Sequence, residues 1–353
     1  MTPEPDIFDV LAKRPTPRVV LCSDPPSGLR AIIALDDTTL GTAVGGTRLR
    51  AYPSTAAAID DAAHLARAMT LKCALGGVDA GGGKMVIMDH PGLQREAAFE
   101  RLGGFVEELG GRFFTAGDLG TTARDVELMA RHSSYVYTDE ASVVASVARG
   151  LVGCVRACVE VAERVLPDAD ADRPLAGLRV AVQGCGAIGV AAARALTLAG
   201  AHLLVADIDR ERASELARAV AGEVVAPDQV LLAEVDVICP CAAGGAITPG
   251  IADRLRAWAV CGAANNILSE IGVAETLLQR GILHVPDVIA SAGGVIDGVG
   301  VNLMGLGDRG PLIDQLGDTA KALLLASRET GRTTEALAIE RAWARIRAHR
   351  SKD

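Results

Sequence analysis

The first part of the chain alternates between short apolar runs and a helical spacing of apolar residues. Residues 19–24 and 29–35 are two such runs, and a Pro-Pro-Ser-Gly turn separates them, so they predict two strands. Residues 54–69 instead place apolar side chains three or four positions apart, which predicts an amphipathic helix with Ser54 or Thr55 as its N-cap. The apolar face of this helix comprises Ala58, Ile59, Ala62, Leu65, Ala66 and Met69.

The alternation of strands and helices continues beyond this helix. Residues 85–88 predict a strand, and residues 96–109 predict a second amphipathic helix. Residues 112–118 predict a strand that ends on Asp118 in a glycine turn. A long helix is then predicted over residues 143–165.

After residue 177, the pattern is typical of a parallel, doubly wound sheet. Residues 178–183 predict a strand, the Gly-x-Gly-x-x-Gly sequence at 184–189 opens a helix, and residues 201–206 predict a strand that ends at Asp207. A lone glycine motif of this kind is weak evidence, but this complete arrangement is typical of a dinucleotide-binding unit. Later strands are predicted at 235–239, 258–261 and 284–285, and terminal helices at 312–328 and 334–349.

Each part of the glycine motif has a physical reason to bind a dinucleotide. Gly184 permits a tight turn, Gly186 lets a pyrophosphate approach the backbone, and Gly189 allows close packing of helix on strand. The helix N-terminus offers unpaired N–H groups to the phosphates. Asp207 would accept hydrogen bonds from ribose hydroxyls and repel a 2′-phosphate, which favours NAD over NADP, although Arg210 weakens this preference. The alternative is a Rossmann-like domain that binds no nucleotide.

The later strands end in loops of small or polar residues. Ligands of open parallel sheets bind at the carboxyl ends of the strands, so Asn265 and Asn266 could offer amide groups there. The alternative is that these asparagines only adopt turn conformations. The predicted cofactor-binding residues are Gly184, Cys185, Gly186, Ala187, Ile188, Gly189, Asp207, Ala242, Ala243 and Asn265.

A segment between Met69 and Lys84 carries two lysines, Lys72 and Lys84, and five of the eleven residues between them are glycine. Each interior glycine costs about 1 kcal/mol in a helix, so this segment is predicted to bend rather than to be helical. Two ammonium groups in one pocket repel each other, so one should lose its proton more readily and serve as a general base while the other holds an anion. The alternative is a flexible surface loop with two solvated lysines.

Length and charge restrict the class of protein further. The 353 residues predict two domains, which we place at 1–145 and 146–325, followed by a C-terminal helix at 326–353 for which packing against the first domain is one option. The net charge of −9, with no basic block, argues against nucleic acid or an anionic membrane as partner. No signal peptide and no uninterrupted run of about 18 apolar residues is apparent, so a soluble, cytoplasmic protein is expected. The eight cysteines and six histidines show no metal-ligand spacing, and neither a metal site nor a disulfide is predicted.

An ordered series of motifs resembles the Glu/Leu/Phe/Val dehydrogenase family, in particular its leucine/phenylalanine/valine branch. The resemblance covers about residues 19–300 and rests on Thr38-Thr-Leu-Gly41, Gly45-Gly-Thr-Arg48, Met69-Thr-Leu-Lys72, Gly81-Gly-Gly-Lys84, Thr115-Ala-Gly-Asp118-Leu-Gly-Thr, the glycine motif, Ala263-Ala-Asn-Asn266, Pro286-Asp287 and Ala292-Gly-Gly. It implies an α/β fold with an N-terminal substrate domain, a C-terminal Rossmann-type NAD domain and a cleft between them.

The resemblance also implies a role for individual residues. Lys72 would bind the substrate carboxylate, Lys84 would be the catalytic lysine, Asp118 would exchange protons with the amine, and Asn266 would help to hold the carboxylate. The residues that would line the substrate pocket are Leu40, Gly41, Val44, Ala116, Val295 and Gly298.

Two further comparisons with the family concern the substrate side chain and the nicotinamide end of the cofactor. Val44 stands where glutamate-specific relatives have a lysine, so an apolar side chain is expected in the substrate, and Gly298 would enlarge the pocket. Val147 aligns with a threonine and Ser291 with an asparagine on the nicotinamide side, so these changes concern the orientation of the cofactor.

The function implied is reversible, NAD-dependent oxidative deamination of an apolar L-amino acid to the 2-oxo acid and ammonia, by a homo-oligomer. One alternative is a paralogue that binds nucleotide or amino acid without turnover. Another is a dehydrogenase for a modified amino acid in a specialised pathway.

Overall fold

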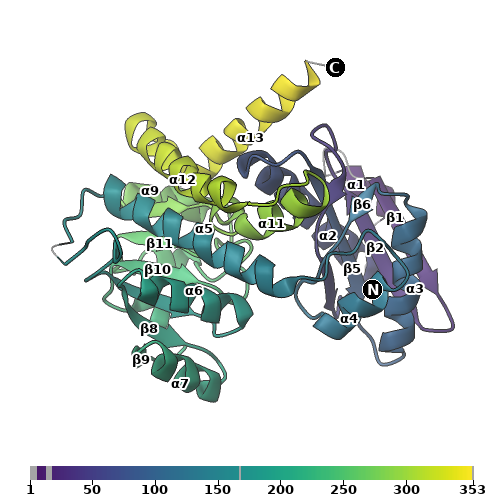
Figure 1. Cartoon of the computed structure of the whole chain (residues 1–353), viewed down its shortest axis with the longest axis horizontal. Helices are drawn as coiled ribbons and strands as arrows, with labels where there is room; N and C mark the ends of the chain where they lie inside the picture. Colours follow the sequence, from purple (N-terminus) through teal and green to yellow (C-terminus); the bar gives the residue numbers. More distant parts are fainter. Residues whose placement is uncertain (1–5, 13–17, 167, 352–353) are drawn as a thin grey trace. The chain divides into compact units, whose positions relative to one another are not determined.

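A computed structural model describes residues 6–12, 18–166 and 168–351, and the chain divides into two compact units (Figure 1). The first unit comprises Met1–Ala141, Gly298–Gly307 and Trp343–Asp353, and the second comprises Ser142–Asp297 and Asp308–Ala342. The sequence-based domain limits at residues 145 and 325 stay a prediction. Helices α11 (Gly293–Asn302) and α13 (Thr334–Arg350) each begin in the second unit and end in the first.

Within the described residues, the first unit contains a six-stranded mixed sheet. The order is β1-β2-β5-β3-β6, with β4 also paired to β5. Strands β1, β2 and β5 pair antiparallel, whereas β3 and β4 run parallel to β5. The strands are β1 (Arg18–Asp24), β2 (Leu29–Leu35), β3 (Ala43–Val44), β4 (Thr47–Arg50), β5 (Gly81–Met88) and β6 (Phe113–Phe114).

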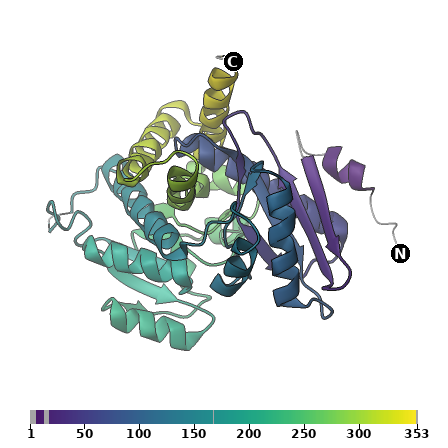
Figure 2. The ribbon, with the colours of Figure 1, turned by 45° about the vertical axis from the view of Figure 1, so that its right-hand side comes forward.

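Helices cover both faces of this sheet. Figure 2 shows α3 (Arg95–Glu108) lying along one face of the sheet. Phe99 of α3 and Met129 of α4 (Ala123–Ala130) pack there with Met85 in one apolar core. On the other face, Ile59 of α2 (Thr55–Leu75) packs with Val86, and α1 (Ile7–Ala12) adds Val10. Met85 and Val86, which are successive residues of β5, therefore pack in the cores on opposite faces of the sheet, as the two-residue period of a strand requires.

The expectation that the two-lysine segment is not helical is wrong for its first part. Helix α2 starts after its N-cap Ser54, as predicted, but it continues through Lys72 to Leu75 and ends at Gly76. The glycines of the segment all lie beyond Leu75, so the helix meets none of them. The glycine run at its other end is strand β5, which begins at Gly81 and not at residue 85.

The glycines of β5 are explained by close packing. A Cβ atom at Gly82 would lie 2.2 Å from the carbonyl oxygen of Ala66 in α2, and a Cβ at Gly83 would lie 2.8 Å from the Phe113 ring. A Cβ at Gly81 would lie 2.4 Å from the Asp37 carbonyl oxygen. These positions need glycine because neighbouring backbone and rings occupy the space, and not because the segment is a flexible loop.

The second unit contains a parallel sheet, also of six strands in the part of the chain that the structure describes. Its order is β12-β11-β10-β7-β8-β9, and every neighbouring pair is parallel. Read from the other edge, this is the 3-2-1-4-5-6 order of the Rossmann fold. The strands are β7 (Arg179–Gln183), β8 (His202–Ala206), β9 (Glu223–Val224), β10 (Val237–Pro240), β11 (Ala259–Cys261) and β12 (Leu283–Val285).

Helices connect the parallel strands of this second sheet, and further helices follow its last strand. Figure 1 shows α5 and α6 over one face of the sheet. The remaining elements of this half are α5 (Glu140–Val161), α6 (Ala187–Leu198), α7 (Arg210–Ala219), the 3-10 turn η1 (Val230–Leu232), α8 (Pro249–Ala252), α9 (Gly272–Gln279), α10 (Asp287–Ala290) and α12 (Gly310–Thr330). The alternation predicted after residue 177 is therefore confirmed.

Helix α5 differs from its prediction in both limits, beginning at Glu140 and ending at Val161 instead of spanning 143–165. By length and composition alone it could cross a membrane, although Arg149 and Arg156 interrupt its apolar sequence. However, 56% of its most apolar window is buried inside the protein, as in the core helix of a soluble protein. All eight cysteines, each within the described residues, are free thiols.

Candidate active site

The first unit contains an ion pair between Lys84 and Asp118. Strand β5 carries Lys84, whose Nζ lies 2.8 Å from Oδ2 of Asp118. Lys84 is only 4% exposed, and the Asp118 side chain is 19% exposed. A Cβ atom at Gly46 would lie 2.9 Å from the Asp118 Cβ and 3.4 Å from Lys84 Nζ, so the glycine of the Gly-Gly-Thr-Arg motif gives this pair its space.

Asp118 is held as a carboxylate by its surroundings. Burial acts to raise the pKa of Asp118, but the charges of Lys84 and Arg48 outweigh burial and hold that pKa well below its usual range. Arg48 donates from Nε to the same oxygen, Oδ2, at 3.0 Å. No role was predicted for Arg48, whose only sequence signal was its place in the Gly-Gly-Thr-Arg motif.

The predicted substrate residues of the first unit lie on the elements around this pair. Lys72 is buried in the last turn of α2, which packs directly on β5. Leu40 and Val44 are buried, whereas Gly41 and Ala116 are half-buried. Gly41 has a φ of +143°, and a Cβ there would lie 2.7 Å from the Asp79 carbonyl oxygen, so glycine is required at this position.

In the second unit, the three glycines of the motif have three different environments. Gly184 has a φ of +99°, and a Cβ there would lie 2.8 Å from the Cβ of Ala242. A Cβ at Gly189 would lie 1.9 Å from the Gly184 carbonyl oxygen, whereas a Cβ at Gly186 would meet nothing within 4 Å. The first and third glycines thus permit close packing, and the second, which is the N-cap of α6, faces open space.

Asp207 lies beside the glycine loop. Its Oδ2 accepts a hydrogen bond from the backbone N–H of Cys185 at 2.6 Å, and its Oδ1 accepts one from the N–H of Asp209 at 2.9 Å. Ala187, Ala242 and Ala243 are exposed, and Ile188 and Asn265 are half-buried. An open glycine flanked by a fixed carboxylate at the carboxyl ends of β7 and β8 fits the pyrophosphate and ribose of a dinucleotide.

Asn266 is positioned by a residue to which the motif analysis assigned no role. Its backbone has a φ of +54°, the left-handed region that asparagine tolerates better than most residues. Its N–H donates to Oδ2 of Asp287 at 3.1 Å, and its carbonyl oxygen accepts from Gly245 N at 2.7 Å. Asp287 therefore acts on the candidate site through the backbone of Asn266.

Val147 and Ser291, the two residues that differ from the family where the nicotinamide is expected, both contact neighbouring residues. Val147 is buried on α5, and a Cβ at Gly294 would lie 3.1 Å from its Cγ2. The Ser291 hydroxyl donates to the Asp287 carbonyl oxygen at 2.6 Å within α10 and its C-cap. Both side chains are thus engaged within the second unit.

Two further residues that were predicted to line the substrate pocket lie on α11, where the chain passes from one unit to the other. Val295 belongs to the second unit and Gly298 to the first, and both are half-buried. A Cβ atom at Gly298 would lie 3.5 Å from Cδ1 of Tyr137, which is an ordinary contact distance. Tyr137 was not singled out from the sequence, since nothing local links it to residue 298.

The predicted site residues thus form two sets. The first unit holds Lys72, Lys84, Asp118, Leu40, Gly41, Val44, Ala116 and Gly298. The second unit holds the glycine motif, Asp207, Ala242, Ala243, Asn265, Asn266 and Val295.

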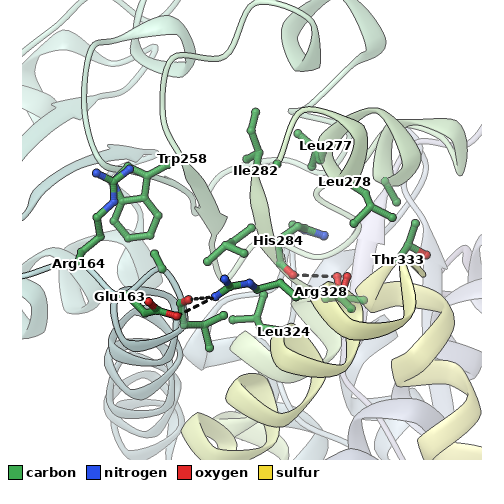
Figure 3. A pocket seen from close by; sticks show the side chains of 18 residues that line it. Glu163, Arg164, Trp258, Leu277, Leu278, Ile282, His284, Leu324, Arg328 and Thr333 are labelled. Carbon is green, nitrogen blue, oxygen red and sulfur yellow. Dashed lines mark hydrogen bonds and ion pairs between the residues drawn. The ribbon is translucent and has the colours of Figure 1, made fainter.

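A separate cavity of about 610 Å³ opens in the second unit, at the amino ends of β11 and β12 (Figure 3). None of the predicted site residues lines it. Two of its polar contacts are internal: Arg328 lies 3.6 Å from Glu163, and the Thr334 hydroxyl donates to the His284 carbonyl oxygen at 2.8 Å. We therefore assign it no part in the chemistry.

A unit with a buried lysine–aspartate pair, followed by a unit with Rossmann strand order and an open glycine loop, defines a two-domain dehydrogenase. Residues 17–135 match the family model described as "Glu/Leu/Phe/Val dehydrogenase, dimerisation domain", and residues 201–298 match "Glutamate/Leucine/Phenylalanine/Valine dehydrogenase". The chain belongs to the Glu/Leu/Phe/Val dehydrogenase family, whose members are amino-acid dehydrogenases.

Similar proteins span most of the chain. A leucine dehydrogenase of Thermoactinomyces intermedius is 37% identical over 82% of this chain and 80% of its own length. A phenylalanine dehydrogenase of Lysinibacillus sphaericus is 36% identical, with 82% and 77% covered. The crystal structure of L-tryptophan dehydrogenase from Nostoc punctiforme superposes with a TM-score of 0.79 at 32% identity, covering 98% of this chain and 99% of that one. The family, the α/β two-domain fold class and the enzyme class expected from the sequence are confirmed.

Proposed function

We propose that the protein is an NAD-dependent dehydrogenase that reversibly converts an apolar L-amino acid to its 2-oxo acid and ammonia. The observation that carries this proposal is the sequestered pair of Lys84 and Asp118, 2.8 Å apart, in the same unit as the buried Lys72. We further propose that it is a cytoplasmic homo-oligomer, with the unit that matches the dimerisation model as the interface.

The side chains of the first unit have distinct tasks in this reaction. Lys72 would bind the substrate carboxylate by charge. Lys84 would take a proton from the water that attacks the iminium carbon. Asp118, ionised at rest, would first accept a proton from the substrate ammonium and later return it to the departing amine. Oxidation of the amino acid with NAD releases a proton to solution, so alkaline solution should favour the oxidative direction.

The second unit would bind the cofactor. The glycine loop and Asp207 would hold NAD, which accepts the hydride from Cα when bound. The fixed carboxylate of Asp207 would repel a 2′-phosphate, so NAD should be used in preference to NADP.

The lining of the pocket supports an apolar substrate. Leu40 and Val44 are buried apolar side chains, and a second substrate carboxylate against them would lack a cationic partner. Gly298 leaves room next to the Tyr137 ring, which supports an aromatic or branched side chain. The similarity to L-tryptophan dehydrogenase makes tryptophan and phenylalanine worth testing first.

The decisive experiment incubates purified protein with NAD and, separately, Leu, Val, Ile, Met, Phe, Trp or Glu, and follows NADH absorbance. We expect oxidation of at least one apolar amino acid, with kcat/KM for Glu lower by about a hundredfold or more. NADP in parallel should give a lower kcat/KM than NAD. Glu as the best substrate would refute the pocket argument.

A second candidate function is binding without turnover, because Val147 and Ser291 change the nicotinamide side. The engaged hydroxyl of Ser291 favours this alternative, whereas the intact pair of Lys84 and Asp118 opposes it. Cofactor binding without oxidation of any amino acid, including modified ones, would support it.

A further inference from the structure

Arg48 connects Asp118 to a second carboxylate on α2. Its guanidinium donates from Nε to Asp118 at 3.0 Å and from Nη1 to Oδ2 of Asp61 at 3.3 Å. The hydroxyl of Tyr52 donates to the same Asp61 oxygen at 2.6 Å. Arg48 is 8% exposed, so these contacts form in a largely desolvated setting.

The backbone fixes the direction in which Arg48 points. The N–H of Thr47 donates to the carbonyl oxygen of Ala116 at 2.8 Å, and the N–H of Leu49 donates to that of Leu119 at 2.9 Å. Thr47 and Leu49 flank Arg48, and Ala116 and Leu119 lie on either side of Asp118 in the sequence. The two hydrogen bonds therefore hold the two segments side by side. The distance between the guanidinium and the carboxylate is therefore set by strand pairing and not only by side-chain attraction.

Lys84 and Arg48 contact the same oxygen of Asp118, but only one of them can hold it throughout a reaction cycle. A lysine that takes a proton from water changes its charge and its hydrogen bonds. An arginine stays protonated in proteins, so its charge is constant. Without a permanent cation, burial would favour the protonated form of Asp118.

We propose that Arg48 is a positioning residue that keeps Asp118 ionised and in place while Lys84 exchanges protons, and that Asp61 and Tyr52 hold Arg48 in turn. This inference rests on the proposed function for its effect on turnover. It assigns a task to three residues that touch neither substrate nor cofactor in the scheme above.

The main test is the pH profile of kcat/KM for the Arg48→Gln variant with the best amino acid. Loss of the permanent charge raises the pKa of Asp118, so the acidic limb should move upward by about one pH unit or more. At pH values below that limb, kcat/KM of the variant should be lower than that of the unmodified protein by about tenfold or more, and it should recover in part at higher pH. The conservative Arg48→Lys variant should move the limb back toward its original position.

Arg50→Gln is the matched control, because it removes a positive charge from the same strand. Arg50 is exposed and lies with its guanidinium carbon 5.4 Å from the centre of the Tyr52 ring, and it does not contact Asp118. Its pH profile should equal that of the unmodified protein. A folded Arg48→Gln variant whose acidic limb is unmoved would overturn the inference.

The role of Asp61 is tested by a double-mutant cycle. If Asp61 acts only through Arg48, the Arg48→Gln/Asp61→Asn variant should lose no more activity than Arg48→Gln alone. Losses that multiply would show that Asp61 acts independently, which contradicts this part of the proposal.

A measurement without turnover separates this inference from the proposed function. Asp118 has a lowered pKa in the folded protein, so its stabilisation is present above about pH 3.9, the value expected when unfolded, and is lost as the pH falls through the folded value. The difference in thermal midpoint between the unmodified protein and Arg48→Gln should therefore narrow on acidification from pH 6. A constant difference overturns the inference, whereas absence of amino-acid oxidation by the unmodified protein overturns only the proposed function.

Discussion

Lys84 and Asp118 show how single residues in this protein acquire their properties from distant neighbours. Lys84 is almost fully buried, yet its charge has a carboxylate partner at 2.8 Å. Asp118 in turn receives two cations on one oxygen, which outweigh the effect of burial on its pKa. A buried charge without such a partner would be strongly unfavourable.

We expect Lys84→Ala to lower kcat for amino-acid oxidation by about 10²–10⁴-fold, the usual contribution of a general base. Binding of NAD, measured by titration calorimetry, should be unchanged because the glycine loop lies in the other unit. Lys72→Ala is the comparison and should act mainly by raising KM. Near-normal turnover by Lys84→Ala would show that the base has been assigned to the wrong residue.

Among the elements, strand β5 depends on its glycines for packing against α2. A Cβ at Gly82 would lie 2.2 Å from both the Ala66 carbonyl oxygen and the Thr70 hydroxyl oxygen. The carbonyl belongs to helix backbone, which cannot move aside without disturbing the helix. The close approach of α2 to β5 is what brings the turn that carries Lys72 onto the strand that carries Lys84.

We therefore expect Gly82→Ala to destabilise the protein by at least about 2 kcal/mol, because it overpacks a rigid contact. Gly250→Ala is the matched control, since Gly250 is exposed in helix α8 and an added Cβ would meet nothing within 4 Å. Denaturant unfolding of both variants measures the difference. Equal midpoints for the two would contradict the packing explanation.

For the whole molecule, the stability should depend on pH through a buried pair in the second unit. His284 of β12 forms an ion pair with Glu335 at the start of α13. Burial acts to lower the pKa of His284, but Glu335, with a smaller contribution from Asp287, outweighs it and raises that pKa. Burial acts to raise the pKa of Glu335, and His284 outweighs it in the opposite direction.

The sign of the pH effect follows from these directions. The stabilisation due to His284 is complete below about pH 6.5, its unfolded value, and is lost as the pH rises through the folded value. Glu335→Gln should therefore lower the thermal midpoint clearly at pH 6 and by a smaller amount at pH 9. Glu340→Gln, which removes an exposed partner of Arg332 from the same helix, should cause a small change that is similar at both pH values. A Glu335→Gln deficit that does not shrink toward pH 9 would disprove the ionised pair.

The sequence by itself determined the strand, the glycine loop and the helix that open the second sheet. The strand at 179–183, the glycine motif and Asp207 are close in sequence, and their order already implies their geometry. The apolar face of α2 and its N-cap Ser54 were likewise readable, because helix periodicity and capping are local. The motif series also identified the family, since it spans most of the chain.

Only the tertiary structure decided how the chemistry-bearing residues are paired. Arg48 and Asp118 are 70 positions apart, and they meet because both flank the same strand pairing. Asn266 is held by Asp287, 21 positions later, and the glycines of β5 proved to be packing positions instead of a loop. The physical reason is that periodicity reports the local conformation of the chain. The order of strands in a sheet, which brings distant residues together, depends on the packing of the whole unit.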